Sequence, residues 1–268
     1  MDLEVLPNMY TMGIDIGSAS SKVVILKDGT DIVAAEVVQF GTGSSGPQRA
    51  LESALGKSGL TLDDMTKIVA TGYGRFSFER ADKQVSEISC HAKGIHFLVP
   101  TARTIIDIGG QDAKAIKLDK NGMVSQFFMN DKCAAGTGRF LDVMARVLEI
   151  SIDEMAEYDS RATEVVSVSS TCTVFAESEV ISHLSNEVPK ENIIAGVHAS
   201  VASKACGLAY RTGLEEDIVM GGGVAKNEGV VKAISRELKK PVKVAPNPQI
   251  TGGLGAALFA YDEAKKAR

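Results

Sequence analysis

Two short segments of the chain share one pattern, a carboxylate followed by a turn of small residues. The first reads Ile14-Asp-Ile-Gly-Ser-Ala-Ser-Ser-Lys22, and the second, 92 residues later, reads Ile106-Asp-Ile-Gly-Gly-Gln-Asp-Ala-Lys114. Each reads as an apolar strand that carries an Asp, then a turn, then a second strand. Backbone amides in such turns can cradle phosphate oxygens, and a neighbouring carboxylate can hold Mg²⁺. The repeat therefore predicts an ATPase built from a duplicated domain.

Three glycine-bearing turns each follow a predicted strand. We call them loop 1 (residues 17–21), loop 2 (residues 109–112) and loop 3 (Gly221-Gly-Gly-Val-Ala-Lys-Asn227). One such turn alone is a weak indication, because glycine turns between strands are common and most have only a structural role. The duplicated carboxylates make phosphate binding the better explanation for the set. Lys22 and Lys114, which follow loops 1 and 2, have an equally good alternative as solvated strand lysines.

Two of the four cysteines, Cys133 and Cys172, each stand just before a predicted helix. Free amides and the positive dipole end at a helix start favour a thiolate, which is a nucleophile or a metal ligand. On placement alone, burial as a small apolar side chain is an equally good explanation. An iron–sulfur cluster normally takes four thiolates, so a symmetric dimer with two from each chain could hold one on its axis.

The other candidate groups are expected to be structural. Cys90 and Cys206 fall among small and apolar residues inside predicted helices, so both are assigned to the core. The sequence has no Cys-x-x-Cys spacing, which argues against a zinc ribbon within one chain. The histidines show no partner spacing, and packing or surface roles are expected for all four, which are His91, His96, His183 and His198.

The three loops resemble those of the superfamily that contains acetate and sugar kinases, heat-shock chaperones and actin. This resemblance implies an α/β, duplicated actin-like (ribonuclease H-like) fold with two domains around a nucleotide cleft. Loops 1 and 2 would hold phosphates and loop 3 adenosine. Asp15 and Asp107 would hold Mg²⁺ through water, and Gln111 would position the attacking water. The residues assigned to ATP or ADP are Ser18, Ala19, Ser20, Ser21, Lys22, Gly109, Gly110, Gly136, Asp142, Gly221, Gly222, Gly223, Lys226 and Gln249.

Two longer segments narrow the resemblance. Asn130-Asp-Lys-Cys-Ala-Ala-Gly-Thr-Gly-Arg-Phe-Leu-Asp-Val-Met144 and Ser169-Ser-Thr-Cys-Thr-Val-Phe-Ala-Glu-Ser-Glu-Val-Ile-Ser182 resemble signatures of the ATP-dependent activators of (R)-2-hydroxyacyl-CoA dehydratases. Those activators share an ATPase family with the nucleotide-binding subunits of benzoyl-CoA reductase. Loop 2, loop 3 and Thr71-Gly-Tyr-Gly-Arg75 match as well, so the resemblance covers almost the whole chain.

This narrower resemblance implies a homodimer with one bridging [4Fe–4S] cluster, held by Cys133 and Cys172 of each subunit. Such a protein takes an electron from ferredoxin or flavodoxin. It passes the electron, coupled to ATP hydrolysis, to the dehydratase, where it starts ketyl-radical dehydration. An oxygen-sensitive protein of anaerobic amino-acid fermentation is therefore expected. The alternatives are an ATPase subunit of a benzoyl-CoA-reductase-type enzyme, a small-molecule kinase of the same fold, and an actin-like filament protein.

Regular elements must position these residues. We expect strands at residues 13–17, 22–27, 32–38, 67–70, 104–108, 113–118, 123–128, 217–220 and 242–244. We expect helices at residues 47–59, 82–99, 139–149, 174–185, 191–211, 226–239 and 252–265. Strands followed by helices, twice over, predict two α/β halves, residues 1–100 and 101–268. The last helix is expected to pack back toward the first half.

Composition limits the class of partner. The chain has 268 residues and a net charge of −5 with no long basic run, which argues against nucleic acid as a partner. Its sequence shows no apolar stretch approaching the roughly 20 residues that span a bilayer, so no membrane association is expected. The start, Met1 to Tyr10, lacks the basic and apolar regions of a signal peptide, and a cytoplasmic location is expected.

Overall fold

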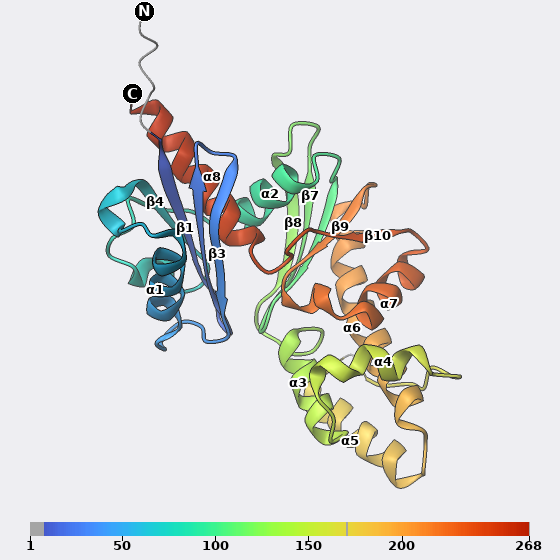
Figure 1. Cartoon of the computed structure of the whole chain (residues 1–268). Helices are drawn as coiled ribbons and strands as arrows, with labels where there is room; N and C mark the ends of the chain where they lie inside the picture. Colours follow the sequence, from blue (N-terminus) through green and yellow to red (C-terminus); the bar gives the residue numbers. More distant parts are fainter. Residues whose placement is uncertain (1–7, 170, 268) are drawn as a thin grey trace, which may run out of the picture. The chain divides into compact units, whose positions relative to one another are not determined.

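The computed structural model describes residues 8–169 and 171–267 (Figure 1). Residues 1–7, part of the start at which no signal peptide is expected, and Ser170 of the second signature lie outside the described residues. The chain forms two compact units. The first unit contains the residues up to Phe97 together with those from Gln249 onward, and the second is Leu98–Pro248.

A five-stranded sheet forms the centre of the first unit. Its order is β3-β2-β1-β4-β5, with β1, β2 and β3 antiparallel and β4 and β5 parallel to β1. The strands are β1 (Tyr10–Ile16), β2 (Ser21–Lys27), β3 (Asp31–Val38), β4 (Met65–Thr71) and β5 (Lys83–Gln84). Alternate residues of β1 are apolar and buried, and Met12 and Ile14 pack with helix α1 (Gly46–Ser58). Each such buried side chain contributes about 1.5–3 kcal/mol to folding.

The other face of this sheet is covered by helix α8 (Thr251–Lys266), drawn in red in Figure 1, which packs on β1, β4 and β2. Helix α8 lies close to the backbone of β1 because Gly13 of β1 has no side chain. A Cβ on Gly13 would lie 2.0 Å from the carbonyl oxygen of Gly253 in α8. Helix α2 (Glu87–Leu98) meets α8 in the same way, since a Cβ on Gly255 would lie 1.8 Å from the Cys90 carbonyl oxygen.

The second unit repeats the sheet. Its order is β10-β9-β6-β7-β8, again with three antiparallel strands and two that run parallel to the central one. The strands are β6 (Thr104–Ile108), β7 (Ala113–Leu118), β8 (Val124–Asn130), β9 (Ile218–Gly221) and β10 (Val242–Val244). The loops also match, because the amide of Gly17 donates to Ser20 O at 3.0 Å and the amide of Gly109 donates to Asp112 O at 2.9 Å. The sequence repeat is therefore a repeat of structure.

Between β8 and β9 the second unit holds a long helical insertion. It comprises α3 (Gly138–Val147), α4 (Met155–Ser160), α5 (Thr173–Ser185) and α6 (Lys190–Thr212). Helix α6 is the one described helix that is long and apolar enough to cross a membrane by composition, and 72% of its most apolar stretch is buried in the protein. Its apolar character reflects its place in the core of this unit, where Ile194, Val197 and Val201 are fully buried.

The differences from the sequence prediction include two helix starts and one additional short helix. The helix expected from residue 82 begins at Glu87, because Asp82 donates its amide to Ile68 O and the next residues form β5 beside β4. Helix α7 (Glu228–Leu238) begins two residues later than expected, because Gly223–Lys226 forms a 3₁₀ turn and Asn227 caps the helix. The short helix α4 was not predicted. The remaining 3₁₀ turns are Leu62–Asp64, Arg75–Ser77 and Ile152–Glu154.

Candidate functional site

The carboxylate of the first hairpin is buried and paired. Asp15 is 3% exposed, and its Oδ2 lies 3.1 Å from Nζ of Lys22, the residue opposite it in the β1–β2 register. The alternative that Lys22 is a solvated strand lysine is therefore wrong. A buried carboxylate is strongly destabilising when it has no partner, so this lysine has a local reason to face inward.

Residues far from Asp15 in the sequence pack around it. Gly72 (φ 84°) follows β4, and a Cβ there would lie 2.5 Å from Asp15 Oδ1. A Cβ on Gly252 of α8 would lie 2.9 Å from Asp15 Oδ2 and 3.1 Å from Nε2 of His91. The other ring nitrogen of His91 lies 2.9 Å from Thr251 Oγ1. His91 and the Asp15 carboxylate thus both pack against Gly252, and sequence spacing gave no signal for this arrangement.

The second hairpin places one lysine among two carboxylates. Lys114 is 4% exposed, and its Nζ lies 3.6 Å from Asp107 Oδ1, across the β6–β7 register. It also forms an ion pair and hydrogen bond with Asp112, which occupies the position of Ser20 in the first hairpin. Burial excludes the solvated alternative for Lys114 as well. Sequence reasoning assigned no role to Asp112, although its place in the Asp-Ile-Gly-Gly-Gln-Asp segment was a signal.

Loop 2 is hydrogen-bonded to the start of α3. The amide of Gly138 donates to Gly109 O at 2.9 Å, and the amide of Arg139 donates to Gly110 O at 2.8 Å. These are amides that a helix start leaves without partners inside the helix. The first residues of α3 are therefore attached directly to the predicted phosphate loop.

Loop 3 lies at the same end of this sheet. Gly221 stands opposite Asp107 in the β9–β6 register. Gly222 has φ 80°, and a Cβ there would lie 2.4 Å from Ile108 O, so only glycine fits the position without rearrangement. Val224 of loop 3 also touches the α3 start, 3.6 Å from the Cβ position of Gly138. Asp107, loop 2 and loop 3 thus form one cluster in the second unit.

The two candidate ligand cysteines also lie close together in the second unit. Cys172 is the N-cap of α5, as predicted. Cys133 does not stand at a helix start, because a turn separates it from α3 and the first α3 amides bind loop 2 instead. The Sγ of Cys133 lies 3.9 Å from Thr171 O, next to Cys172, and both thiols are half-buried.

The remaining cysteines are core residues, as expected. Cys90 is fully buried in α2, and Cys206 is 1% exposed in α6. Burial raises the pKa of each thiol to about 12. A thiol with such a pKa is almost entirely protonated at neutral pH, which makes it a poor metal ligand or nucleophile.

Comparison with known proteins identifies the family of the chain. The model of the BadF/BadG/BcrA/BcrD ATPase family matches residues 12–260. The chain belongs to this ATPase family. It is 74% identical over 258 residues to the activator of lactoyl-CoA dehydratase from Anaerotignum propionicum, covering 96% of this chain and all of that one.

Solved structures agree with the family assignment. The activator of the 2-hydroxyisocaproyl-CoA dehydratase from Clostridium difficile, solved with bound ADPNP, has a TM-score of 0.94 at 57% identity, and 97% of each chain is covered. A ROK hexokinase from Thermus thermophilus, with a TM-score of 0.55 at 16% identity, covering 96% of this chain and 100% of that one, shares the fold alone. The fold is thus the actin-like ATPase fold that the sequence predicted, and as a member of this family the chain is an ATPase.

The other predicted nucleotide residues of this ATPase are spread over loops and helix ends. Ser18, Ala19 and Ser20 are half-buried in loop 1, and the Ser21 hydroxyl donates to Phe40 O at 2.8 Å. Gly136 has φ 83° in the turn that follows Cys133. The rest lie at exposed or half-buried positions, which are Gln111 in loop 2, Asp142 on α3, Gly223 and Lys226 in loop 3, and Gln249 before α8.

The donor set around the cysteines fits half of an iron–sulfur centre. Within residues 8–169 and 171–267, no three His, Cys, Asp or Glu side chains gather in a way that could hold a metal ion. Two neighbouring, partly exposed thiols are instead a suitable half-set for a cluster that takes four thiolates. A four-thiolate cluster at this place would need two further thiolates from another chain.

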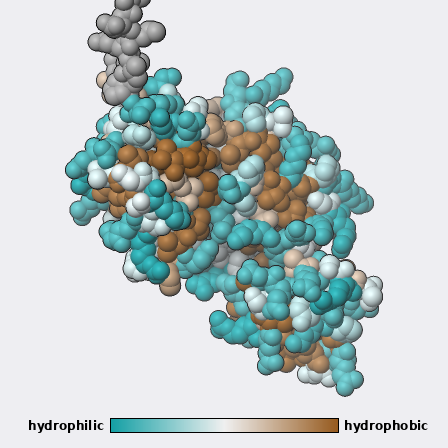
Figure 2. All heavy atoms as spheres, viewed as in Figure 1, coloured by the Kyte–Doolittle hydropathy of each residue, from teal (hydrophilic) through white to brown (hydrophobic). Residues whose placement is uncertain are grey.

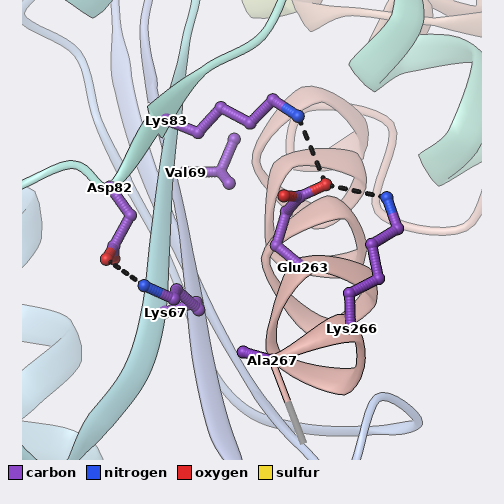
Figure 3. Close-up of a pocket in the computed structure, with 7 residues that line it drawn as sticks. All are labelled: Lys67, Val69, Asp82, Lys83, Glu263, Lys266 and Ala267. Carbon is purple, nitrogen blue, oxygen red and sulfur yellow. Dashed lines mark hydrogen bonds and ion pairs between the residues drawn. The ribbon is translucent and has the colours of Figure 1, made fainter.

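A separate cavity of about 290 Å³ lies in the first unit, between β4, β5 and the end of α8 (Figure 3). Lys67 pairs with Asp82 at 2.6 Å, and Lys83 and Lys266 both reach Glu263, at 3.2 and 3.0 Å. The cavity lies against Lys67 and Val69 in the middle of β4, whereas Asp15 pairs with Thr71 at the end of that strand. Because each lysine has a carboxylate partner, we regard this cavity as a structural seam that holds α8 to the sheet.

Proposed function

We propose that this chain is the ATP-dependent activator of a 2-hydroxyacyl-CoA dehydratase. In this proposal it is a homodimer with one bridging [4Fe–4S] cluster, and it accepts an electron from ferredoxin or flavodoxin. ATP hydrolysis drives transfer of that electron to the dehydratase, where ketyl-radical dehydration begins. The observation that carries the proposal is the pair of partly exposed thiols, Cys133 and Cys172, beside a helix attached to a predicted phosphate loop. The high identity to a lactoyl-CoA dehydratase activator supports it.

The proposed nucleotide-binding roles are those expected from the sequence. Loops 1 and 2 offer backbone amides to phosphate oxygens, and loop 3 holds adenosine, with Lys226 exposed beside it. Asp15 and Asp107 would hold Mg²⁺, which would neutralise charge on the phosphates. Lys22 and Lys114 keep both carboxylates in place. Gln111, exposed in loop 2, orients the attacking water.

The cysteines of two chains complete one ligand set in this proposal. Cys133 and Cys172 of each subunit supply two thiolates, and the cluster, when bound, supplies one-electron transfer at low potential. Helix α5 offers a surface for the second copy, because apolar side chains beside Cys172 are exposed. Val174 is 65% exposed, Phe175 63% and Ile181 49%. Hydrophobic side chains are visible at the surface of the part that holds α3 and α5 (Figure 2).

Coupling of ATP to electron transfer follows from the attachment of α3. A nucleotide phosphate that rearranges loop 2 moves the carbonyls of Gly109 and Gly110, and these accept the first amides of α3. The turn that carries Cys133 leads directly into this helix. A change of nucleotide state thus alters the surroundings of the thiolate, and charge, hydrogen bonds and exposure set the potential of a cluster.

Two alternatives make different predictions. A small-molecule kinase of this fold needs a site for the phosphate acceptor and has no use for two neighbouring thiols. An ATPase subunit of a benzoyl-CoA-reductase-type enzyme shares its cluster with a different chain, whereas the activator assembles from one chain alone. Iron content and oligomeric state therefore separate all three possibilities.

The test is anaerobic purification of the chain expressed by itself, with iron analysis and absorption spectroscopy. We expect a dimer with about four iron atoms. Cys133→Ser should abolish iron binding, because each chain supplies half of the ligands. The control Cys206→Ala should keep the cluster, since this thiol is buried in α6. Full iron content in Cys133→Ser, or a monomer without iron in the wild type, would overturn the proposal.

A further inference from the structure

A fully buried histidine connects loop 3 to α6. His198 of α6 is 0% exposed, and its Nε2 lies 3.1 Å from Nδ2 of Asn227. Asn227 ends loop 3, directly after the 3₁₀ turn Gly223–Lys226. Sequence reasoning expected His198 to have an ordinary packing role. Its polar contact with the end of a predicted nucleotide loop requires a different explanation.

The hydrogen bonds fix the direction of this contact. The side-chain oxygen of Asn227 accepts from the amides of Gly229 and Val230, at 3.0 and 3.2 Å, and so caps α7. The amide NH₂ of Asn227 must therefore face the ring, and Nε2 of His198 must accept. The ring proton is then on Nδ1, 3.5 Å from Oδ2 of Asp159 in α4.

The ring has little freedom to move. A Cβ on Gly229 would lie 2.4 Å from His198 Nδ1 and 2.8 Å from Asp159 Oδ2. Glycine at this position lets α7 pack directly on the ring and the carboxylate. The Asp159, His198 and Asn227 side chains thus form one packed polar group that joins α4, α6 and the loop 3–α7 junction.

The side of α6 that faces away from His198 carries residues at four-residue spacing. These residues contact the segment that leads to Cys172. Asn192 Oδ1 accepts from the amides of Thr163 and Glu164, at 3.0 and 3.2 Å. Gly196 and Ser200, four and eight residues after Asn192, contact the same segment further along. A Cβ on Gly196 would lie 2.2 Å from Val166 O, and Ser200 Oγ donates to Ser169 O at 3.0 Å.

The same stripe also reaches the turn that carries Cys133. Lys204, four residues after Ser200, packs over Gly136, whose Cβ position lies 2.7 Å from Cβ of Lys204. Residues four apart lie on one side of a helix, whereas His198, between Gly196 and Ser200, points to the other side. Helix α6 therefore contacts both cysteine segments on one side and loop 3 on the other.

We propose that α6 couples loop 3 to both cysteine segments, with His198 as the positioning residue that attaches the loop to the helix. This inference rests on the proposed function in one respect, the binding of nucleotide at loop 3. A nucleotide that orders loop 3 fixes Asn227, and through His198 it restrains α6 and the segments that end at Cys133 and Cys172. Such coupling is reciprocal, so changes at the cysteines also alter nucleotide affinity.

The test measures thiol alkylation in the iron-free full-length protein with and without saturating ADPNP. Cys133 and Cys172 are partly exposed and react, whereas Cys90 and Cys206 are buried with pKa values near 12 and stay unmodified. In the wild type we expect ADPNP to change the alkylation rate of the two exposed cysteines about fivefold or more, within the usual range of coupling between sites. Calorimetric titration measures ADPNP affinity in parallel.

Three variants separate the polar contact from packing. His198→Leu fills the space but leaves no acceptor for Asn227, so ADPNP should bind and the rate ratio should fall to about one. His198→Gln offers an oxygen acceptor and should restore the response. The matched control Cys206→Ala removes a buried side chain from the same helix without touching Asn227, and it should respond like the wild type. Should His198→Leu not fold, Asn227→Ser keeps a capping oxygen for α7 but is too short to reach the ring, and the same loss is expected.

Each outcome has a distinct meaning. A wild type that binds no ADPNP contradicts the proposed function itself. A wild type that binds ADPNP without any change in alkylation contradicts coupling through α6. A normal response in His198→Leu, or an equal loss in Cys206→Ala, shows that His198 is not the positioning residue.

Discussion

The two hairpins have the same backbone but different surroundings for their carboxylates. In both, the first amide of the loop donates to the carbonyl three residues on, at 3.0 Å in loop 1 and 2.9 Å in loop 2. In the first hairpin Asp15 pairs directly with Lys22 at 3.1 Å. In the second, Asp107 is 3.6 Å from Lys114, which also pairs with Asp112. The Asp112 carboxylate has no counterpart in the first hairpin, and because of it the charge of Lys114 is shared between two carboxylates.

The loops also differ in what they hold. The carbonyl of Gly17 accepts from the amide of Thr42 at 2.8 Å, in the connection between β3 and α1. The carbonyls of Gly109 and Gly110 instead accept from the start of α3, in the insertion that carries both candidate ligand cysteines. Duplication therefore accounts for two similar loops. Among the described residues, the insertion that carries the cysteines is hydrogen-bonded to the second of these loops.

The largest effect is expected from the carboxylate of the second hairpin. Asp107→Asn removes a charge proposed to hold Mg²⁺, so ATP hydrolysis should fall by about 10²-fold or more, as for the loss of other preorganised electrostatic contacts. The cluster spectrum should stay intact, because Cys133 and Cys172 are unchanged. Steady-state ATPase assays and absorption spectra measure the two effects. Normal hydrolysis in this variant would contradict the assignment of Asp107.

A smaller effect should separate the two hairpins. In Asp112→Asn, Asp107 is the remaining carboxylate of this hairpin that can pair with Lys114. The pair then resembles Asp15 and Lys22 in the first hairpin. Lysine then competes with Mg²⁺ for Asp107, and the apparent KM for Mg²⁺ should rise about tenfold. Ser20→Ala, the matched change in loop 1, removes no charge and keeps the backbone amides of the loop, so it should change this KM less than Asp112→Asn does. Equal KM values in wild type and Asp112→Asn would show that sharing of the lysine charge is irrelevant to the metal.

The sequence predicted the order of nearly all elements, because apolar strands and helical periodicity are local features. It also predicted the paired hairpins, since the 92-residue repeat preserves Asp, Gly and Lys at matching positions. The start of α2 was wrong because the pairing of β5 with β4 is a tertiary contact. Helix α4, at six residues, is too short to give a periodic signal.

Contacts between distant residues could not be predicted. His91 and Asp15, packed against Gly252, and His198, bonded to Asn227, join segments whose spacing in the chain shows no pattern. The same holds for Cys133, where helix propensity located α3 but could not show that its first amides bind loop 2. The bonds between α3 and loop 2 distinguish the second hairpin from the first, and the bond between His198 and Asn227 carries the further proposal. Such contacts can be identified only from the three-dimensional structure.

In the proposed function, nucleotide state changes the surroundings of the cluster. The most direct measurement is the rate of iron removal by a chelator from the anaerobic dimer, compared between the ADP-bound form and the form holding an ATP mimic. Nucleotide occupancy is verified in both. Because loop 2 is bonded to α3 and loop 3 to α6, we predict clearly different rates in the two states. Equal rates would contradict ATP-driven electron transfer, since the nucleotide loops would then have no effect on the metal centre.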